Sequence, residues 1–253
     1  MAERTGRVAA RAVAVAATAL LLGGCSFQPL PPGGTEQAKS AHEMWVLFAL
    51  AGLGVALLIW GLIFWCVFRY RQRPGDDGSF PTQFRRNDRM EIVYTGLPIV
   101  LVAVLFAYTY AAERHIETIA PRPDVVVDVA AYRWSWRFAY PALGIGIAGT
   151  PERPPEFVLP VGKTTRLNVT SVDVDHSFWV PAFLFKRDAI PGVRNVFDWT
   201  PVKIGTFRGE CGEYCGLKHA LMSFTVRVVT PQAFEQWVRG QHRIARTTDG
   251  GSH

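Results

Sequence analysis

Three long apolar runs dominate the first half of the chain. The first extends from Val8 to Leu22, and the second and third, Met44 to Phe68 and Ile92 to Ala112, contain no charged residue. A helix rises about 1.5 Å per residue, so each uncharged run can span a hydrocarbon core of about 30 Å. A buried core helix can be equally apolar, but two such runs in one small chain favour a transmembrane helical hairpin over residues 44–112.

The first run has the features of an export signal. Arg4 and Arg7 precede it, and small residues follow it, which is typical of a secretory signal peptide. Its end, Leu22-Gly23-Gly24-Cys25, resembles the lipobox of bacterial lipoproteins. The resemblance implies cleavage after residue 24 and a lipid on Cys25, and the alternative is an uncleaved anchor. Residues 25–43 begin with a Pro/Gly-rich stretch and are predicted to form an extended linker.

Charge sets the orientation of the hairpin. The loop between the two uncharged runs contains six arginines: Arg69, Arg71, Arg73, Arg85, Arg86 and Arg89. Short loops rich in arginine stay in the cytoplasm, so residues 113–253 are expected outside a bacterial cell membrane that the chain crosses more than once. The net charge of +6 is mostly this topology signal, and residues 124–237 are nearly neutral, which argues against nucleic-acid binding.

The second half of the chain has a β pattern. Short runs rich in Val, Phe, Tyr and Trp recur between Pro and Gly residues, a spacing that predicts a β-sandwich or barrel over residues 113–239. The candidate strands are 125–129, 132–140, 156–161, 164–172, 176–183, 193–199, 203–208 and 222–229. Thr230 and Pro231 then predict a short helix ending at Val238, and residues 240–253 are expected to be a mobile tail.

Candidate metal ligands gather at the end of this domain. Cys211, Cys215, His219 and Met222 lie within twelve residues, and His176 lies 35 residues upstream. Structural zinc sites have four ligands, and methionine is not among the usual ones. Thiolate, imidazole and thioether together indicate copper used in electron transfer. Two cysteines suggest two coppers bridged by two thiolates. The competing interpretations are a disulfide in an oxidising compartment, a core histidine and a packing methionine.

The spacing Cys-x-Glu-x-Cys-Gly-x-x-His-x-x-Met, with Asp-x-x-His-Ser upstream, resembles the dinuclear copper A signature of cytochrome c oxidase subunit 2. The similarity covers residues 41–238. It implies a cupredoxin fold outside the membrane that accepts electrons from cytochrome c. The electrons then pass to the haems of subunit 1, where oxygen is reduced to water with proton pumping. The expected partners are therefore subunit 1 and other oxidase subunits, a soluble or tethered cytochrome c, and the lipid bilayer.

The resemblance also assigns roles to the ligands. Cys211 and Cys215 would bridge both coppers. His176 and Met222 would complete one copper, and His219 and the backbone carbonyl of Glu213 the other. The Glu213 side chain would reach a magnesium ion at the border with subunit 1, although it can equally be an exposed loop acid.

Two further motifs fit the same family. Residues 132–138 resemble its aromatic stretch, in which Trp134 would receive the electron from cytochrome c, with Arg133 where glutamine is usual. Residues 90–98 resemble the start of its second helix, in which Glu91 would lie at the entrance of a proton path into subunit 1. The simpler alternatives are strand packing for Trp134 and a favourable helix-dipole interaction for Glu91. Asp173 matches a family acid near the docking face.

Other classes fit less well. A copper-binding assembly factor of the Sco type is the main alternative, but it has a thioredoxin-like fold and proline after its second cysteine, where this chain has Gly216. A quinol oxidase subunit 2 lacks the copper ligands. A nitrous oxide reductase shares the copper site but has a large propeller and no membrane hairpin.

Overall fold

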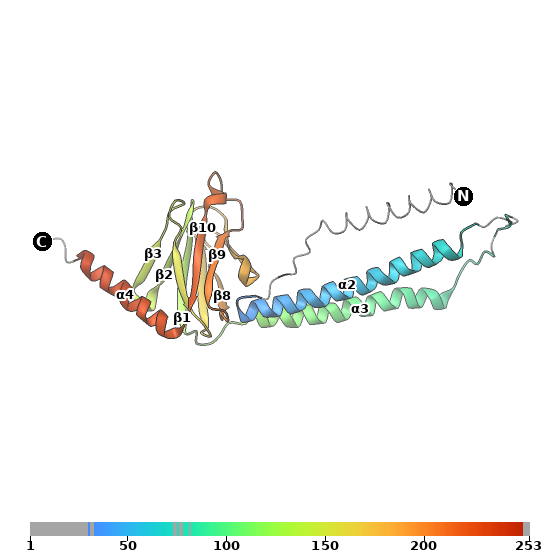
Figure 1. Cartoon of the computed structure of the whole chain (residues 1–253), viewed down its shortest axis with the longest axis horizontal. Helices are drawn as coiled ribbons and strands as arrows, with labels where there is room; N and C mark the ends of the chain where they lie inside the picture. Colours follow the sequence, from blue (N-terminus) through green and yellow to red (C-terminus); the bar gives the residue numbers. More distant parts are fainter. Residues whose placement is uncertain (1–29, 31–32, 73–74, 76–77, 81, 250–253) are drawn as a thin grey trace, which may run out of the picture. The chain divides into compact units, whose positions relative to one another are not determined.

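The computed structural model describes residues 30, 33–72, 75, 78–80 and 82–249 (Figure 1). The predicted signal segment, residues 1–24, and the predicted lipid-bearing Cys25 lie outside the described residues.

Two long apolar helices come first in the described chain. They are α2 (Glu36–Arg69) and α3 (Asp88–Ile116), and both are long and apolar enough to cross a membrane. Each begins at a side-chain cap: Thr35 Oγ1 accepts a hydrogen bond from Ala38 N at 3.1 Å, and Asn87 Oδ1 accepts one from Met90 N at 3.3 Å. Such a cap contributes about 1 kcal/mol to a helix.

The start of α2 corrects one prediction. Residues 25–43 were expected to be an extended linker, but the helix begins at Glu36. The segment after Thr35 contains Glu, Gln, Ala and Lys, which are good helix formers, so the cap and the local propensity extend the membrane helix N-terminally.

The second half of the described chain is a β-sandwich of two five-stranded sheets. The first sheet has the order β3-β2-β1-β5-β8, and the second has the order β4-β10-β9-β6-β7. The first comprises β1 (Val125–Tyr132), β2 (Ser135–Tyr140), β3 (Ile145–Ala148), β5 (Thr165–Ser171) and β8 (Asn195–Trp199). The second comprises β4 (Glu156–Pro160), β6 (His176–Val180), β7 (Phe185–Ala189), β9 (Gly205–Cys211) and β10 (Ser223–Val229). The predicted order of two apolar helices followed by a β-sandwich is confirmed.

Aromatic side chains fill the space between the sheets. Phe178 and Phe224 stack with ring centroids 4.7 Å apart, and Trp136 meets both edge-on. All three are buried, as expected for strands whose inward residues alternate with outward ones. This aromatic core lies directly behind His176, whose ring centroid is 6.2 Å from that of Trp136.

Three details differ from the predicted elements. The stretch 132–140 was expected to be one strand, but a turn at residues 133–134 divides it between β1 and β2. Strands β3 and β7 were not predicted, because they are short and their sequences contain Gly or charged residues rather than a clear alternation. The last helix, α4, runs over Pro231–Asp249 and passes Gly240, where a mobile tail was expected. A single glycine costs a helix only about 1 kcal/mol, so Gly240 does not stop it.

Candidate metal centre

Two neighbouring strands bring the distant ligands together. His176 is the first residue of β6 and Cys211 is the last residue of β9, and these strands pair antiparallel with Phe178 opposite Cys211. The remaining candidates lie in the loop from β9 to β10. That loop closes through a hydrogen bond from Cys211 N to Met222 O at 3.0 Å. The pairing of β6 with β9 thus brings His176 close to Cys211, although the two residues are 35 positions apart in the sequence.

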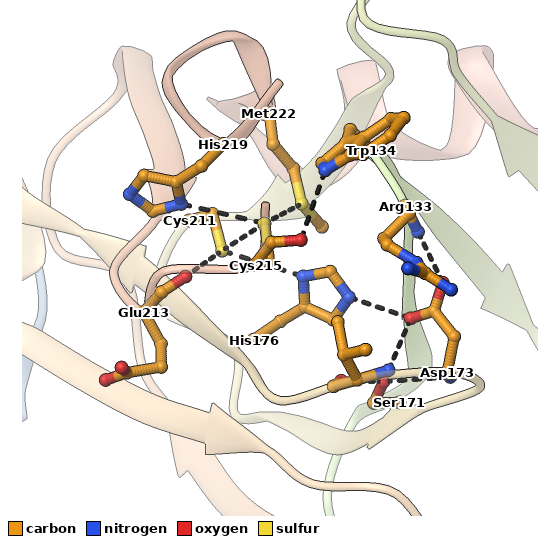
Figure 2. A network of polar contacts seen from close by, with 11 residues as sticks. Arg133, Trp134, Ser171, Asp173, His176, Cys211, Glu213, Cys215, His219 and Met222 are labelled. Carbon is orange, nitrogen blue, oxygen red and sulfur yellow. Dashed lines mark hydrogen bonds and ion pairs between the residues drawn. The ribbon is translucent and has the colours of Figure 1, made fainter. Parts of the chain in front are cut away.

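The Cys211 sulfur lies at the centre of one half of the cluster (Figure 2). Its Sγ is 3.8 Å from the Cys215 Sγ and 3.7 Å from His176 Nδ1. The thiol also donates to the Glu213 carbonyl oxygen at 3.2 Å. His176, Cys211 and Cys215 are all buried, and their ligand atoms lie within 4.8 Å of one another.

The Cys215 sulfur contacts the rest of the donors. It lies 3.6 Å from His219 Nδ1 and 3.7 Å from Met222 Sδ. Donors bound to one tetrahedral ion at about 2.0–2.3 Å are roughly 3.3–3.8 Å apart. The donor atoms are therefore spaced as a metal requires, and the two free thiols are too far apart for a disulfide, whose sulfurs are about 2.05 Å apart. This donor set fits soft-metal ions, copper included.

The two thiols have different acidities. Burial raises the pKa of Cys211, but hydrogen bonds from His176 and from the backbone outweigh it and lower the pKa to about 7. Burial, followed by repulsion from Cys211, raises the pKa of Cys215 to about 12. Without a cation, one thiolate is stabilised beside the imidazole, and a second at 3.8 Å is disfavoured.

Asp173 holds the far side of the His176 ring. Burial raises its pKa, but the hydrogen bond with His176 and bonds from backbone N–H groups outweigh this and lower the pKa to about 2. Its Oδ1 lies 3.0 Å from His176 Nε2, and its Oδ2 accepts a hydrogen bond from Arg133 N at 2.8 Å (Figure 2). A carboxylate behind a metal-binding histidine fixes the ring and its tautomer. Asp173, matched in sequence to a docking acid, is thus occupied by contacts within the chain.

Trp134 adjoins the same cluster. Its indole Nε1 donates to the Cys215 carbonyl oxygen at 3.2 Å, and the side chain is half-buried. The neighbouring Gly216 has a φ of +114°, and a Cβ there would lie 3.4 Å from the Trp134 Nε1. The backbone conformation and the close ring together favour glycine at this position.

The other predicted residues have different locations. The Glu213 side chain is exposed, and only its carbonyl faces the thiols. Glu91 lies in the first turn of α3, exposed and on a different element from the cluster. Sequence reasoning missed the contact between Asp173 and His176; their spacing of three residues beside a ligand histidine was the available signal.

The fold and the site define a β-sandwich with a candidate metal site, carried on two apolar helices. A family model described as "Cytochrome C oxidase subunit II, periplasmic domain" matches residues 152–229. A "Probable cytochrome c oxidase subunit 2" of Streptomyces coelicolor is 38% identical over 88% of this chain and 83% of that protein. One from Nocardia farcinica is 32% identical over 96% of this chain and 84% of that protein.

The chain belongs to the cytochrome c oxidase subunit 2 family. The solved periplasmic domain of subunit II of a cytochrome oxidase from Bradyrhizobium japonicum is also similar. It is 35% identical, covers 49% of this chain and 98% of that domain, and has a TM-score of 0.45. The two apolar helices and a domain described as periplasmic indicate a membrane protein with its C-terminal domain outside the cell. The family does not favour the Sco-type alternative.

The unequal thiols predict how the metal-free protein titrates. Thiolate ultraviolet absorbance of the full chain should rise with a midpoint near pH 7, because the Cys211 thiolate is stabilised at that pH. Cys211→Ser should remove this transition, and the matched variant Cys215→Ser should retain it. A transition that persists in Cys211→Ser contradicts the assignment.

Proposed function

We propose that this chain is the electron-transfer subunit of a respiratory haem–copper oxidase, with a dinuclear copper A centre in the cluster described above. It accepts electrons from cytochrome c and passes them to the haems of subunit 1, where oxygen is reduced to water and protons are pumped. The observation that carries the proposal is the meeting of two thiols, two imidazoles and a thioether at contact distances of 3.6–3.8 Å. The family relatives, named cytochrome c oxidase subunit 2, support it.

The six candidate donors divide between two ions. Cys211 and Cys215 contact each other, and each of the other donors contacts one of these two sulfurs. The two cysteines are therefore suited to bridge two coppers as thiolates. His176 and Met222 would complete one ion, and His219 and the Glu213 carbonyl would complete the other. When bound, a copper pair takes up and gives up one electron, spread over both ions.

The chain itself keeps this site dry and fixed. Cys211, Cys215, Met222 and His176 are each at most 6% exposed, so little water reaches the donors. Asp173 orients His176 through the hydrogen bond to Nε2, and the β6–β9 pairing fixes the ring relative to Cys211. A rigid, water-poor shell reduces the rearrangement that accompanies each change of charge.

Trp134 is the residue through which electrons arrive. Its ring is partly exposed, and its Nε1 donates to the carbonyl of a ligand cysteine at 3.2 Å. It therefore links the surface to the Cys215 backbone in a single hydrogen bond. The nearby charges Asp173 and Arg133 pair with each other, so steering of a basic donor by this surface is weak.

In the proposed topology the chain crosses a bacterial cell membrane twice, and the proton entrance lies on the side opposite the sandwich. The arginine-rich loop between the helices stays cytoplasmic, and Glu91 lies at the loop end of α3. The signal segment 1–24 and lipid attachment at Cys25 complete the proposed topology. The exposed Glu213 carboxylate is free to bind a magnesium ion shared with subunit 1.

Copper loading tests the proposed centre. The full chain, purified in detergent and loaded with copper, should bind two ions and give an electron-spin signal split by two copper nuclei. Cys211→Ser should lose this signal because a bridging thiolate is removed. Met222→Leu should keep both ions and shift the reduction potential. Glu213→Gln is the control: it keeps the backbone carbonyl and should retain both copper ions and the copper signal. One copper per chain, a zinc ion or a Cys211–Cys215 disulfide contradicts the proposal.

The role of Trp134 is tested by the rate at which reduced cytochrome c reduces the centre. Trp134→Phe should slow this step by about tenfold, equivalent to roughly 1.4 kcal/mol of barrier, while both coppers remain bound. Tyr214→Phe is the control, because Tyr214 is an aromatic residue 76% exposed on the ligand loop between β9 and β10, next to Cys215, whose carbonyl Trp134 binds. An unchanged rate in Trp134→Phe returns the ring to a packing role.

Proton delivery is tested at the first turn of α3. In the assembled oxidase, Glu91→Gln should slow oxygen reduction several-fold and leave the copper spectrum unchanged, because the residue is remote from the cluster. Asp88→Asn, in the same turn, is the control for a helix-dipole role. Equal effects of the two substitutions, or none, would remove Glu91 from the proton path.

A further inference from the structure

The segment just before and at the start of α2 is bonded to the sandwich. We call Gly33–Gln37 the base strap. Gly34 N donates to Ala182 O at 2.9 Å, and Val202 N donates to Gly34 O at 2.9 Å. Glu36 N donates to Thr200 O at 3.0 Å, and Thr200 N donates to the Gln37 side chain at 3.2 Å. Four hydrogen bonds therefore set the register between the helix and the sandwich.

The base strap is tightly packed against the sandwich. Thr35, which caps α2, is 0% exposed, and Ala38 is 1% exposed. A Cβ on Gly34 would lie 2.7 Å from the Phe183 ring, closer than packed atoms allow. That ring is fully buried and packs edge-on against Trp199 with centroids 4.9 Å apart, so it cannot move aside.

The hydrogen-bond partners of the base strap adjoin strands β6 and β9, which carry His176 and Cys211. They lie at the opposite end of each strand from the ligand. Ala182 follows β6, which begins with His176. Thr200 and Val202 precede β9, which ends with Cys211. Strand β9 has seven residues and at about 3.3 Å each spans roughly 20 Å. The start of α2 is thus connected to the ligands through two paired strands.

The end of α3 is fastened to the same sandwich. Ala120 N donates to Asp198 Oδ2 at 2.7 Å, and Arg166 binds both oxygens of Asp198, whose side chain is only 2% exposed. Glu117, the C-cap of α3, pairs with Arg187 of β7, the strand next to β6. Both membrane helices are therefore tied to the sandwich by specific polar contacts.

We infer that the base strap is a positioning device: it fixes the distance between the metal centre and the membrane helices, and so between the centre and its electron acceptor. The inference rests on the proposed function. The rate of electron transfer falls steeply as the distance between donor and acceptor grows, so a rigid mount has a direct kinetic value. The residues of the base strap act only through β6 and β9 and touch no ligand.

Gly34→Ala in the assembled oxidase tests the inference. The added methyl displaces the base strap from Phe183, whereas the matched control Gly146→Ala adds a methyl where nothing lies within 4 Å. Gly34→Ala should keep parent copper content, copper spectrum and reduction by cytochrome c, and slow the onward transfer from the centre to the haems several-fold. The control should behave as the parent does in every step.

Two results overturn the inference. One is a parent rate of onward transfer in assembled Gly34→Ala. The other is an equal loss of copper signal and of both transfer steps, which marks a merely structural role. If Gly34→Ala does not assemble, Gln37→Ala is the deciding variant, because it removes only the hydrogen bond from Thr200 N. It should slow onward transfer alone by about twofold. An unchanged rate of onward transfer overturns the inference. If the unmodified oxidase lacks a two-copper signal, the proposed function itself is wrong. This outcome is distinguishable from failure of the inference because it is seen without any substitution.

Discussion

Two sulfur atoms buried 3.8 Å apart impose the central constraint on this molecule. Two unit negative charges near 4 Å repel by about 4 kcal/mol at an effective dielectric constant of 20. The chain can therefore keep one thiolate beside His176, but a second requires positive charge between or beside the sulfurs. Bound metal ions would supply that charge, and the remaining donors lie at contact distance from the same two sulfurs. The doubly ionised cluster therefore favours a bound cation.

Several parts of the sandwich hold this pair and its neighbours in place. The β6–β9 pairing delivers His176 to Cys211, and Asp173 locks the imidazole from behind. The aromatic core behind Trp136 supplies a packed and water-poor wall. The base strap continues the same strands toward the membrane helices. In the proposed function, ligand geometry, electron arrival and electron departure would therefore all depend on this one packed domain.

The sequence was most informative where chemistry is local. Two uncharged runs predict helices without any tertiary information, and the spacing of Cys211 to Met222 already places four donors in one loop. The β character of the second half followed from its short apolar runs. These features were predictable because each depends on residues close in the chain.

What the sequence did not predict depends on contacts between distant residues. The base strap joins residues near 35 to residues near 200, and no local pattern marks that pairing. Strand β7 has the sequence Phe-Lys-Arg-Asp-Ala and is strand only because it pairs with β6. The pairing of Asp173 with both Arg133 and His176 likewise requires the turn between β1 and β2 to lie beside β6.

X-ray absorption at the copper edge of the copper-loaded, full-length protein measures directly whether two thiolates bridge two coppers. Two bridging thiolates would place sulfur atoms at about 2.3 Å from copper, as in zinc–thiolate bonds, and a second copper as a close neighbour. Copper surrounded only by nitrogen and oxygen, with no metal neighbour, would contradict this arrangement.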